Sequence, residues 1–315
     1  MTTPKLLVVG GGKMGSAMVA GILDAGWAAA DEVAVVDPDA GQRERLAERH
    51  RGLIVLDAPI DAEGAVLAVK QDAVDAACRA LGALGVPRVL SVVAGISTAR
   101  LESALPLGTV VVRAVPNTPA LVGAGVAAMS GGSTAIGADL DWAEGILAAV
   151  GRVFRLPERH LDAVTGLSGS GPAYVFLVVE AMIEAGVLAG LPRDLSRDLV
   201  VGTLSGSAKL LDETGDDPAV LRAGVTSPGG TTAAGLRTLE LRRCAPPSSK
   251  RWRRQPSGHG SWVADRPLTG AGPGHPPTGC LPGLGEGDGP DPGRRVPCHH
   301  GHAAAVEDDP CPREL

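Results

Sequence analysis

The sequence predicts an α/β protein: a Rossmann-type parallel-sheet domain, then a smaller all-helical domain and a disordered tail. Three observations predict this. Short β-branched runs alternate with Ala-rich helical stretches over residues 1–155, which is typical of βαβ units and a parallel sheet. Residues 156–242 contain long apolar helical patterns with few strand signals, and no period survives in residues 243–315. The length of 315 residues suits about two folded domains.

The first part, residues 1–155, is predicted to be a dinucleotide-binding Rossmann domain. Helical patterns such as MGSAMVAGILDAG and AGQRERLAERH separate its expected strands. Because only 2% of the residues are aromatic, we expect a core of Ala, Val, Leu and Ile. The expected strands are LLVVG, EVAVVD, GAVLAV, RVLSVVAG and TVVVRAV.

The second part, residues 156–242, is predicted to be all helical. Its two long patterns are AYVFLVVEAMIEAGVLAG and LPRDLSRDLVVGTLSGSAKLLDETG. GLP separates the two helices, with Pro192 placed to start the second one.

The third part, residues 243–315, contains 13 of the chain's 25 prolines and 4 of its 5 cysteines. Such a segment cannot bury enough apolar surface to offset its ordering entropy, so we expect it to be disordered. A shifted reading of plausible GC-rich codons permits a regular final helix instead, which suggests a change of reading frame near Arg243. We therefore expect no metal site at Cys298, His299 and their neighbours.

Composition and charge exclude several classes of protein. The net charge of −6 and the pI near 5.7 argue against a nucleic-acid partner. We expect no apolar run that approaches the roughly 18–20 residues needed to span a bilayer. The chain opens on a strand-like KLLVVG without a signal-peptide pattern, and Cys78 is the only cysteine before residue 244. We therefore expect a cytoplasmic protein without membrane or nucleic-acid partners.

A glycine turn between the first strand and the first helix predicts a dinucleotide site. Gly10, Gly12 and Gly15 fit the G-x-G-x-x-G pattern, with Lys13 and Met14 inside it. Gly10 permits the tight turn, Gly12 lets the backbone approach a pyrophosphate, and Gly15 permits close packing of helix on strand. The helix N-terminus then offers free N–H groups to the phosphates. A purely structural glycine turn is the alternative.

Asp37 ends the second strand at the place where a carboxylate binds the adenosine ribose of such a cofactor. A carboxylate there repels a 2′-phosphate and favours NADH. Arg43 and Arg45 follow on the next helix and could offset this repulsion, so both NADH and NADPH stay open as cofactors.

Two further strand ends are expected to line the nicotinamide side, because ligands bind at the carboxyl ends of parallel strands. The first strand end has Ala68, Val69 and Lys70, and the second has Ala94 and Gly95. The alternative for Lys70 is a solvated lysine at a strand end.

A loop with the sequence SPGGTT is predicted to grip an anion. Ser227, Thr231 and Thr232 offer hydroxyl donors, while Gly229 and Gly230 let backbone N–H groups converge. The alternative is a plain Ser-Pro-Gly turn with helix capping. Asn117, in VPNTPA, is a further candidate for binding cofactor or substrate, although Asn before Thr-Pro is also a good turn residue.

The chain over about residues 5–241 resembles the pyrroline-5-carboxylate reductases. The resemblance rests on motifs in family order, above all PNTPALVGAG, SGSGPAYVF and VTSPGGTTAAGLRTLE. It implies a Rossmann domain, a helical dimerisation domain, and hydride transfer from NAD(P)H to the C=N carbon of 1-pyrroline-5-carboxylate in proline biosynthesis. It also implies that the SPGGTT loop holds the substrate carboxylate, with Thr232 near the ring nitrogen. Lys13, where the family often has Asn, Gln71, where it often has Pro, and the tail depart from the family pattern.

Two other functions stay open on the sequence. One is another Rossmann imine reductase or a dehydrogenase of the β-hydroxyacid type. The dehydrogenase shares this domain plan but needs a catalytic lysine on the long apolar helix, which has none. A dinucleotide-binding protein that is inactive because of its tail is the other.

Overall fold

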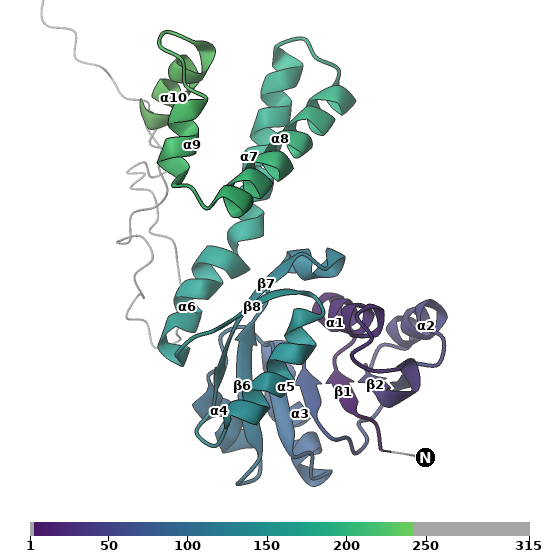
Figure 1. Ribbon diagram of the computed structural model, residues 1–315. Coiled ribbons are helices and arrows are strands. Elements are labelled where there is room, and N and C mark those ends of the chain that lie inside the picture. Colours follow the sequence, from purple (N-terminus) through teal and green to yellow (C-terminus); the bar gives the residue numbers. More distant parts are fainter. Residues whose placement is uncertain (1–2, 242–315) are drawn as a thin grey trace, which may run out of the picture. The chain divides into compact units, whose positions relative to one another are not determined.

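The computed structural model describes residues 3–241, and its main feature is an eight-stranded sheet (Figure 1). The strand order is β3-β2-β1-β4-β5-β6-β7-β8. The strands are β1 (Leu6–Val9), β2 (Val33–Val36), β3 (Ile54–Leu56), β4 (Ala65–Leu67), β5 (Arg88–Ser91), β6 (Val110–Val115), β7 (Gly125–Gly131) and β8 (Gly151–Arg155). All five expected strands are present, and β3, β7 and β8 were not expected.

The first six strands are parallel, whereas β7 runs antiparallel to β6 and β8 runs parallel to β7. Residues 116–124 join β6 to β7 through a short 3₁₀ helix, η3 (Thr118–Val122). Because a parallel crossover needs a dozen or more residues, so short a link favours the antiparallel direction. The helix α5 (Gly137–Ala148) then provides the longer crossover from β7 to β8.

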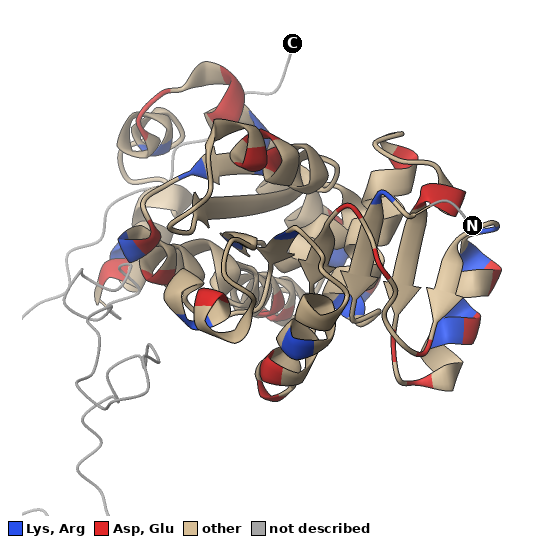
Figure 2. Cartoon of the chain, turned by 90° about the horizontal axis from the view of Figure 1, so that it is seen from below, with Lys and Arg blue, Asp and Glu red and all other residues tan. Residues whose placement is uncertain are grey.

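Helices cover both faces of the sheet, and alternate strand residues face the two layers. Leu6 and Val8 of β1 pack in one core cluster with α1 (Lys13–Asp24), α2 (Ala40–Arg49) and α5. Leu7 and Val9 pack in the other cluster with α3 (Val74–Ala83) and α4 (Thr98–Ala104). The predicted core of Ala, Val, Leu and Ile is confirmed, since these residues, with Met, make up nearly all of both clusters. Charged residues lie mostly on helices and loops, and the strands carry few (Figure 2).

The remaining described chain is helical, as expected. A helix begins at η4 (Glu158–His160), continues through α6 (Leu161–Val164) and a π-helical turn, η5 (Thr165–Gly169), and enters α7. The later helices are α7 (Gly171–Leu188), α8 (Arg193–Thr214), α9 (Pro218–Gly224) and α10 (Thr231–Leu241). Pro192 is the N-cap of α8, which confirms its expected place. The predictions for residues 243–315, including the change of reading frame, lie outside the described residues.

One sequence expectation is wrong here. Within residues 3–241, the helical stretch Glu158–Leu188 is long and apolar enough to cross a membrane by length and composition, with a mean hydropathy of 1.6 in its most apolar window. The structure describes every residue of α7, and none of them is buried.

Candidate active site

Two glycines of the predicted turn are required by the chain's own packing. Gly10 has a φ of +102°, and a Cβ on it would lie 2.7 Å from the carbonyl oxygen of Ala68. A Cβ on Gly15 would overlap the carbonyl oxygen of Gly10, so Gly15 lets α1 approach the end of β1. These two positions therefore need glycine even without a cofactor.

Gly12 differs from both, because a Cβ on it would meet no atom within 4 Å. It lines an open cleft of about 520 Å³ at the carboxyl ends of the strands and immediately precedes α1. Its missing side chain thus leaves room in the cleft, not in the core. Room of this kind beside a helix N-terminus fits the close approach of a pyrophosphate.

The peptide of Gly11 is held from both sides. Its N–H donates to Oδ2 of Asp37 at 2.8 Å, and its carbonyl oxygen accepts from the hydroxyl of Ser16 at 2.6 Å and from Nε2 of Gln42. The other oxygen of Asp37 accepts from the N–H of Asp39 at 2.9 Å. Asp37 therefore braces the glycine turn as well as lining the cleft, and Gln42 is a bracing residue that sequence reasoning missed.

The lining of the cleft contains half of the predicted cofactor residues. Gly10, Gly12, Asp37, Ala68, Val69 and Lys70 are among its eleven lining residues. Its charged lining consists of three aspartates, Asp37, Asp39 and Asp72, and one lysine, Lys70. Two of the aspartates follow β2, at the end where the adenosine ribose is expected. This end is thus more acidic than the sequence pattern alone indicates.

The two arginines that could offset this acidity are bonded to the chain itself. Arg43 donates to the carbonyl oxygens of Asp37 and Pro38, each at 2.9 Å. Arg45 donates to Oε1 of Gln42 at 2.8 Å and 3.1 Å. A 2′-phosphate would have to compete with these acceptors for either guanidinium.

The remaining predicted cofactor residues lie around the cleft rather than in its lining. Lys13 and Met14 begin α1, with Lys13 exposed and Met14 packed on the core. Ala94 and Gly95 lie in the exposed loop between β5 and α4, where Gly95 has a φ of +76°. Gln71, which departs from the family pattern, donates to the carbonyl oxygen of Ala94 at 2.6 Å and so ties this loop to the end of β4.

Asn117 is engaged in internal hydrogen bonds. Its Oδ1 accepts from the N–H of Val126 at 2.8 Å, and its Nδ2 donates to the carbonyl oxygen and the hydroxyl of Ser168, both at 3.3 Å. The side chain thus joins the end of β6 to β7 and to the π-helical turn. These bonds favour a structural role for Asn117 over cofactor contact.

The SPGGTT loop leads directly into α10. Gly229 has a φ of +69°, the N–H of Gly230 donates to the carbonyl oxygen of Ser227 at 3.1 Å, and α10 begins at Thr231. Thr232 is half-buried. The loop is therefore a tight turn at the N-terminus of a helix, which is suited to an anion. Within residues 3–241, no hydrogen bond or ion pair links this loop to the residues that line the cleft.

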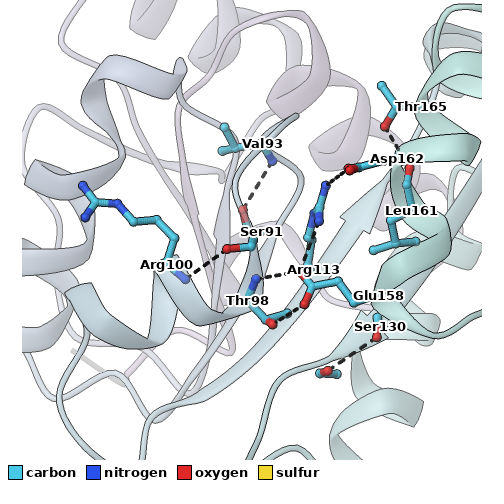
Figure 3. Close-up of polar contacts among 12 residues, drawn as sticks. Ser91, Val93, Thr98, Arg100, Arg113, Ser130, Glu158, Leu161, Asp162 and Thr165 are labelled. Carbon is cyan, nitrogen blue, oxygen red and sulfur yellow. Dashed lines mark hydrogen bonds and ion pairs between the residues drawn. The ribbon is translucent and has the colours of Figure 1, made fainter. Parts of the chain in front are cut away.

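A buried arginine joins the sheet to the start of the helical region (Figure 3). Arg113, on β6, is only 4% exposed. Its guanidinium contacts Oε1 of Glu158 at 3.1 Å and Oδ1 of Asp162 at 3.3 Å. Glu158 also accepts from the N–H of Thr98 at 2.7 Å and from its hydroxyl at 2.6 Å. Burial alone would raise the pKa of the Glu158 carboxyl, but hydrogen bonds from Thr98 and Arg113 outweigh it and hold that pKa below its usual range.

Comparison with known proteins decides the family. A family model described as pyrroline-5-carboxylate reductase dimerisation matches residues 158–246, and one described as NADP oxidoreductase, coenzyme F420-dependent, matches residues 5–95. The pyrroline-5-carboxylate reductase of Synechocystis is 40% identical over 240 residues, covering 75% of this chain and 90% of the relative. The chain belongs to the pyrroline-5-carboxylate reductase family. The enzyme of the same name from Mycobacterium tuberculosis is 41% identical over 263 residues, covering 75% and 89%.

Solved structures of the family agree with the fold. The reductase from Coxiella burnetii has a TM-score of 0.70 at 31% identity, covering 77% of this chain and 92% of that one. The Plasmodium falciparum pyrroline carboxylate reductase, solved with NADP bound, has a TM-score of 0.69 at 30% identity, covering 77% and 91%. The chain is thus an NAD(P)-dependent oxidoreductase with a Rossmann-like domain and a helical region.

The dimerisation match also accounts for the apolar surface of α7. The match covers all of α7, whose exposed residues include Phe176 at 65% and Leu177 at 66%. A helix that packs against a second copy needs an apolar exterior in the single chain. By length and composition alone, this helix fits a membrane span equally well. Membership of a family with a dimerisation region therefore explains why the helix is so apolar.

Proposed function

We propose that this chain reduces 1-pyrroline-5-carboxylate to L-proline with NAD(P)H, the last step of proline biosynthesis. The observation that carries the proposal is the open cleft at Gly12, built on a dinucleotide glycine turn in a chain that covers about nine tenths of its reductase relatives. Membership of the reductase family supports the reaction class. The NADP bound to the Plasmodium falciparum relative supports the cofactor class.

In this proposal the cofactor lies across the glycine turn. Gly10, Gly12, Lys13, Met14 and Gly15 form the turn that receives the pyrophosphate. Asp37 binds the adenosine ribose with the lone pairs left by the N–H groups of Gly11 and Asp39. The nicotinamide end is lined by Ala68, Val69, Lys70, Ala94 and Gly95. Asn117 supports this end indirectly, through its bonds to Val126 and Ser168.

The substrate carboxylate is held by the SPGGTT loop. The hydroxyl groups of Ser227 and Thr231 and the N–H groups around Gly229 and Gly230 are the donors, aided by the positive end of α10. Thr232, at the second position of α10, is proposed to contact the ring nitrogen. The proposal requires the loop and the nicotinamide end of the cleft to meet in the working assembly.

The reaction needs little acid–base catalysis from the protein. The substrate is a cyclic imine whose ring nitrogen is protonated in its iminium form, so no strong acid is needed. Bound NAD(P)H supplies the hydride. The protein's own residues hold the carboxylate, orient the ring and keep the imine carbon in register with the cofactor, which is the main source of rate. The absence of lysine from α7 (Gly171–Leu188) leaves a β-hydroxyacid-type dehydrogenase without its expected base.

We also propose that the chain works as a homo-oligomer, a dimer or larger, in the cytoplasm, where the NAD(P)H pool for biosynthesis is available. Its proposed division is a Rossmann domain at 1–155, a helical dimerisation and substrate domain at 156–242, and an out-of-frame tail from 243. Expressing the chain beside a version whose frame is restored after Arg243 tests the last point. Equal melting temperature, oligomer mass and activity would contradict it.

The direct test of function is turnover. Purified full-length protein is mixed with 1-pyrroline-5-carboxylate and either NADH or NADPH, and the loss of the reduced cofactor and the appearance of proline are both measured. We expect stoichiometric proline. NAD(P)H binding without proline formation would support the inactive dinucleotide-binding alternative and contradict the reductase.

A further inference from the structure

The loop between β5 and α4 is fixed at several points outside the cleft. At its start, the buried hydroxyl of Ser91 accepts from the N–H of Val93 at 3.3 Å. In its middle, Gln71 donates to the carbonyl oxygen of Ala94 at 2.6 Å. At its end, the hydroxyl of Ser97 caps α4 by accepting from the N–H of Arg100. The exposed Ala94 and Gly95 thus lie between fixed points.

The last fixed point comes from the helical region. Glu158 receives both donors of Thr98, its N–H at Oε1 and its hydroxyl at Oε2. Sixty residues separate the two in the chain. Since Thr98 is the first residue of α4 and is buried, Glu158 fixes where the loop turns into the helix. A two-point bond of this kind fixes orientation as well as position.

Arg113 in turn holds Glu158. Its guanidinium is buried and contacts Glu158 and Asp162, and among residues 3–241 its Nε has no hydrogen-bond partner. The two carboxylates differ in one respect. Glu158 contacts both Arg113 and Thr98, whereas the bonds described for Asp162 reach Arg113 alone. Substituting each carboxylate in turn therefore distinguishes a role in placing the loop, through Thr98, from a role in the ion pair with Arg113.

We infer that Glu158 is a positioning residue for hydride transfer, which acts through Thr98 on the loop that carries Ala94 and Gly95. The inference rests on the proposed function, in which this loop lines the nicotinamide. Glu158 is the first residue of the helical region that matches the dimerisation family, so the carboxylate couples the placement of that region to the nicotinamide end of the cleft. Misplacement of reacting groups by about 1 Å can cost a hundredfold in rate.

If Glu158 only holds the two regions together, the expected result is different. In that case the ion pairs to Arg113 matter, and truncating either carboxylate should have the same effect. A positioning role depends on the bonds to Thr98 instead, and these can be made by an uncharged side chain. Glutamine at position 158 keeps an acceptor for the N–H of Thr98 and a polar group beside its hydroxyl.

The experiment compares Glu158→Ala, Glu158→Gln and Asp162→Ala with the wild-type full chain. We measure kcat, KM for pyrroline-5-carboxylate, NADH affinity by fluorescence, and the kinetic isotope effect with NADH deuterated at C4. For Glu158→Ala we expect at least about a tenfold loss in kcat and a raised isotope effect, with KM and NADH affinity within about threefold. Glu158→Gln should recover most of kcat, and Asp162→Ala should keep it.

Several results would overturn the inference. Equal losses in kcat from Glu158→Ala and Asp162→Ala would reduce Glu158 to a structural tie, as would an unchanged isotope effect in a slow Glu158→Ala enzyme. If Glu158→Ala does not fold, Thr98→Val replaces it, and unaltered kcat and isotope effect there would also contradict the role. A wild-type chain that binds NADH but makes no proline would instead contradict the proposed function, and this inference with it.

Discussion

The sheet region and the helical region bury their apolar residues in opposite ways. In residues 3–155 the strands and covering helices form two core clusters whose members are almost wholly buried. In α7 no residue is buried, and in α8 only Ser196 and Val200 are. Most of the large exposed apolar side chains of the described chain belong to residues 174–241. The sheet region can therefore fold on its own core, while the helical region needs a second copy to cover its surface.

The largest expected effect comes from breaking that surface. Phe176→Asp places a charge on the exposed face of α7 and should weaken self-association by about 2–4 kcal/mol, roughly 30- to 1,000-fold. NADH affinity should stay within about threefold, because the cleft lies in the other region. Mass by light scattering and cofactor binding by fluorescence test this. Leu107→Asp, at a fully exposed site before β6, is the matched control and should leave the mass unchanged. A Phe176→Asp protein of wild-type mass would contradict the comparison.

The next effect separates two glycines of one turn. Gly15→Ala puts a Cβ against the carbonyl oxygen of Gly10 and should lower the free energy of unfolding by about 1–3 kcal/mol or more. Gly12→Ala meets nothing within 4 Å, so its melting temperature should match the wild type while its NADH affinity falls. Thermal melts with and without NADH measure both. Equal decreases in melting temperature for the two variants would show that Gly12, like Gly15, is needed for packing and not for cofactor binding.

The glycine turn was predictable from sequence because its parts are adjacent, whereas its braces were not. Gln42, Gln71 and Glu158 act on residues 31, 23 and 60 positions away, and no local pattern marks such pairs. The five central strands were predicted from their β-branched runs. The strand β7 (GVAAMSG) is rich in Gly and Ala, and β8 (GRVFR) is a charged edge strand, so neither carries the usual signal.

A comparable effect is expected in the substrate loop of the helical region. Thr232→Ala removes a hydroxyl group proposed to contact the substrate and should lower kcat/KM by about 1–3 kcal/mol, roughly 5- to 150-fold. NADH affinity should barely change. Steady-state kinetics at low substrate concentration provide the test, with Thr238→Ala, on the exposed side of the same helix, as the control. An unaltered rate in Thr232→Ala would remove this residue from the site.

A smaller effect concerns cofactor preference in the sheet region. With two aspartates after β2, NADH should be used at least as well as NADPH. Asp37→Ser should shift the ratio of kcat/KM toward NADPH by about tenfold, or 1.4 kcal/mol. Asp39→Asn keeps the N-cap of α2 and leaves the brace of Gly11 untouched, so it isolates the effect of charge. A strong wild-type preference for NADPH would contradict the assigned role of Asp37.

The smallest effect lies at the junction between the two regions. Because hydrogen bonds lower the pKa of Glu158 in the folded chain, its contribution to stability is fully present above the ordinary glutamate pKa of about 4.3. It is lost as the pH falls through the lower, folded pKa. Melting temperatures of wild type and Glu158→Gln should thus differ most near neutral pH and converge on the acid side of about pH 4. Glu158 is partly exposed, so solvent screening keeps the difference small. A constant difference down to that acid limit would mean that the carboxylate charge, and with it the ion pair to Arg113, does not stabilise the junction.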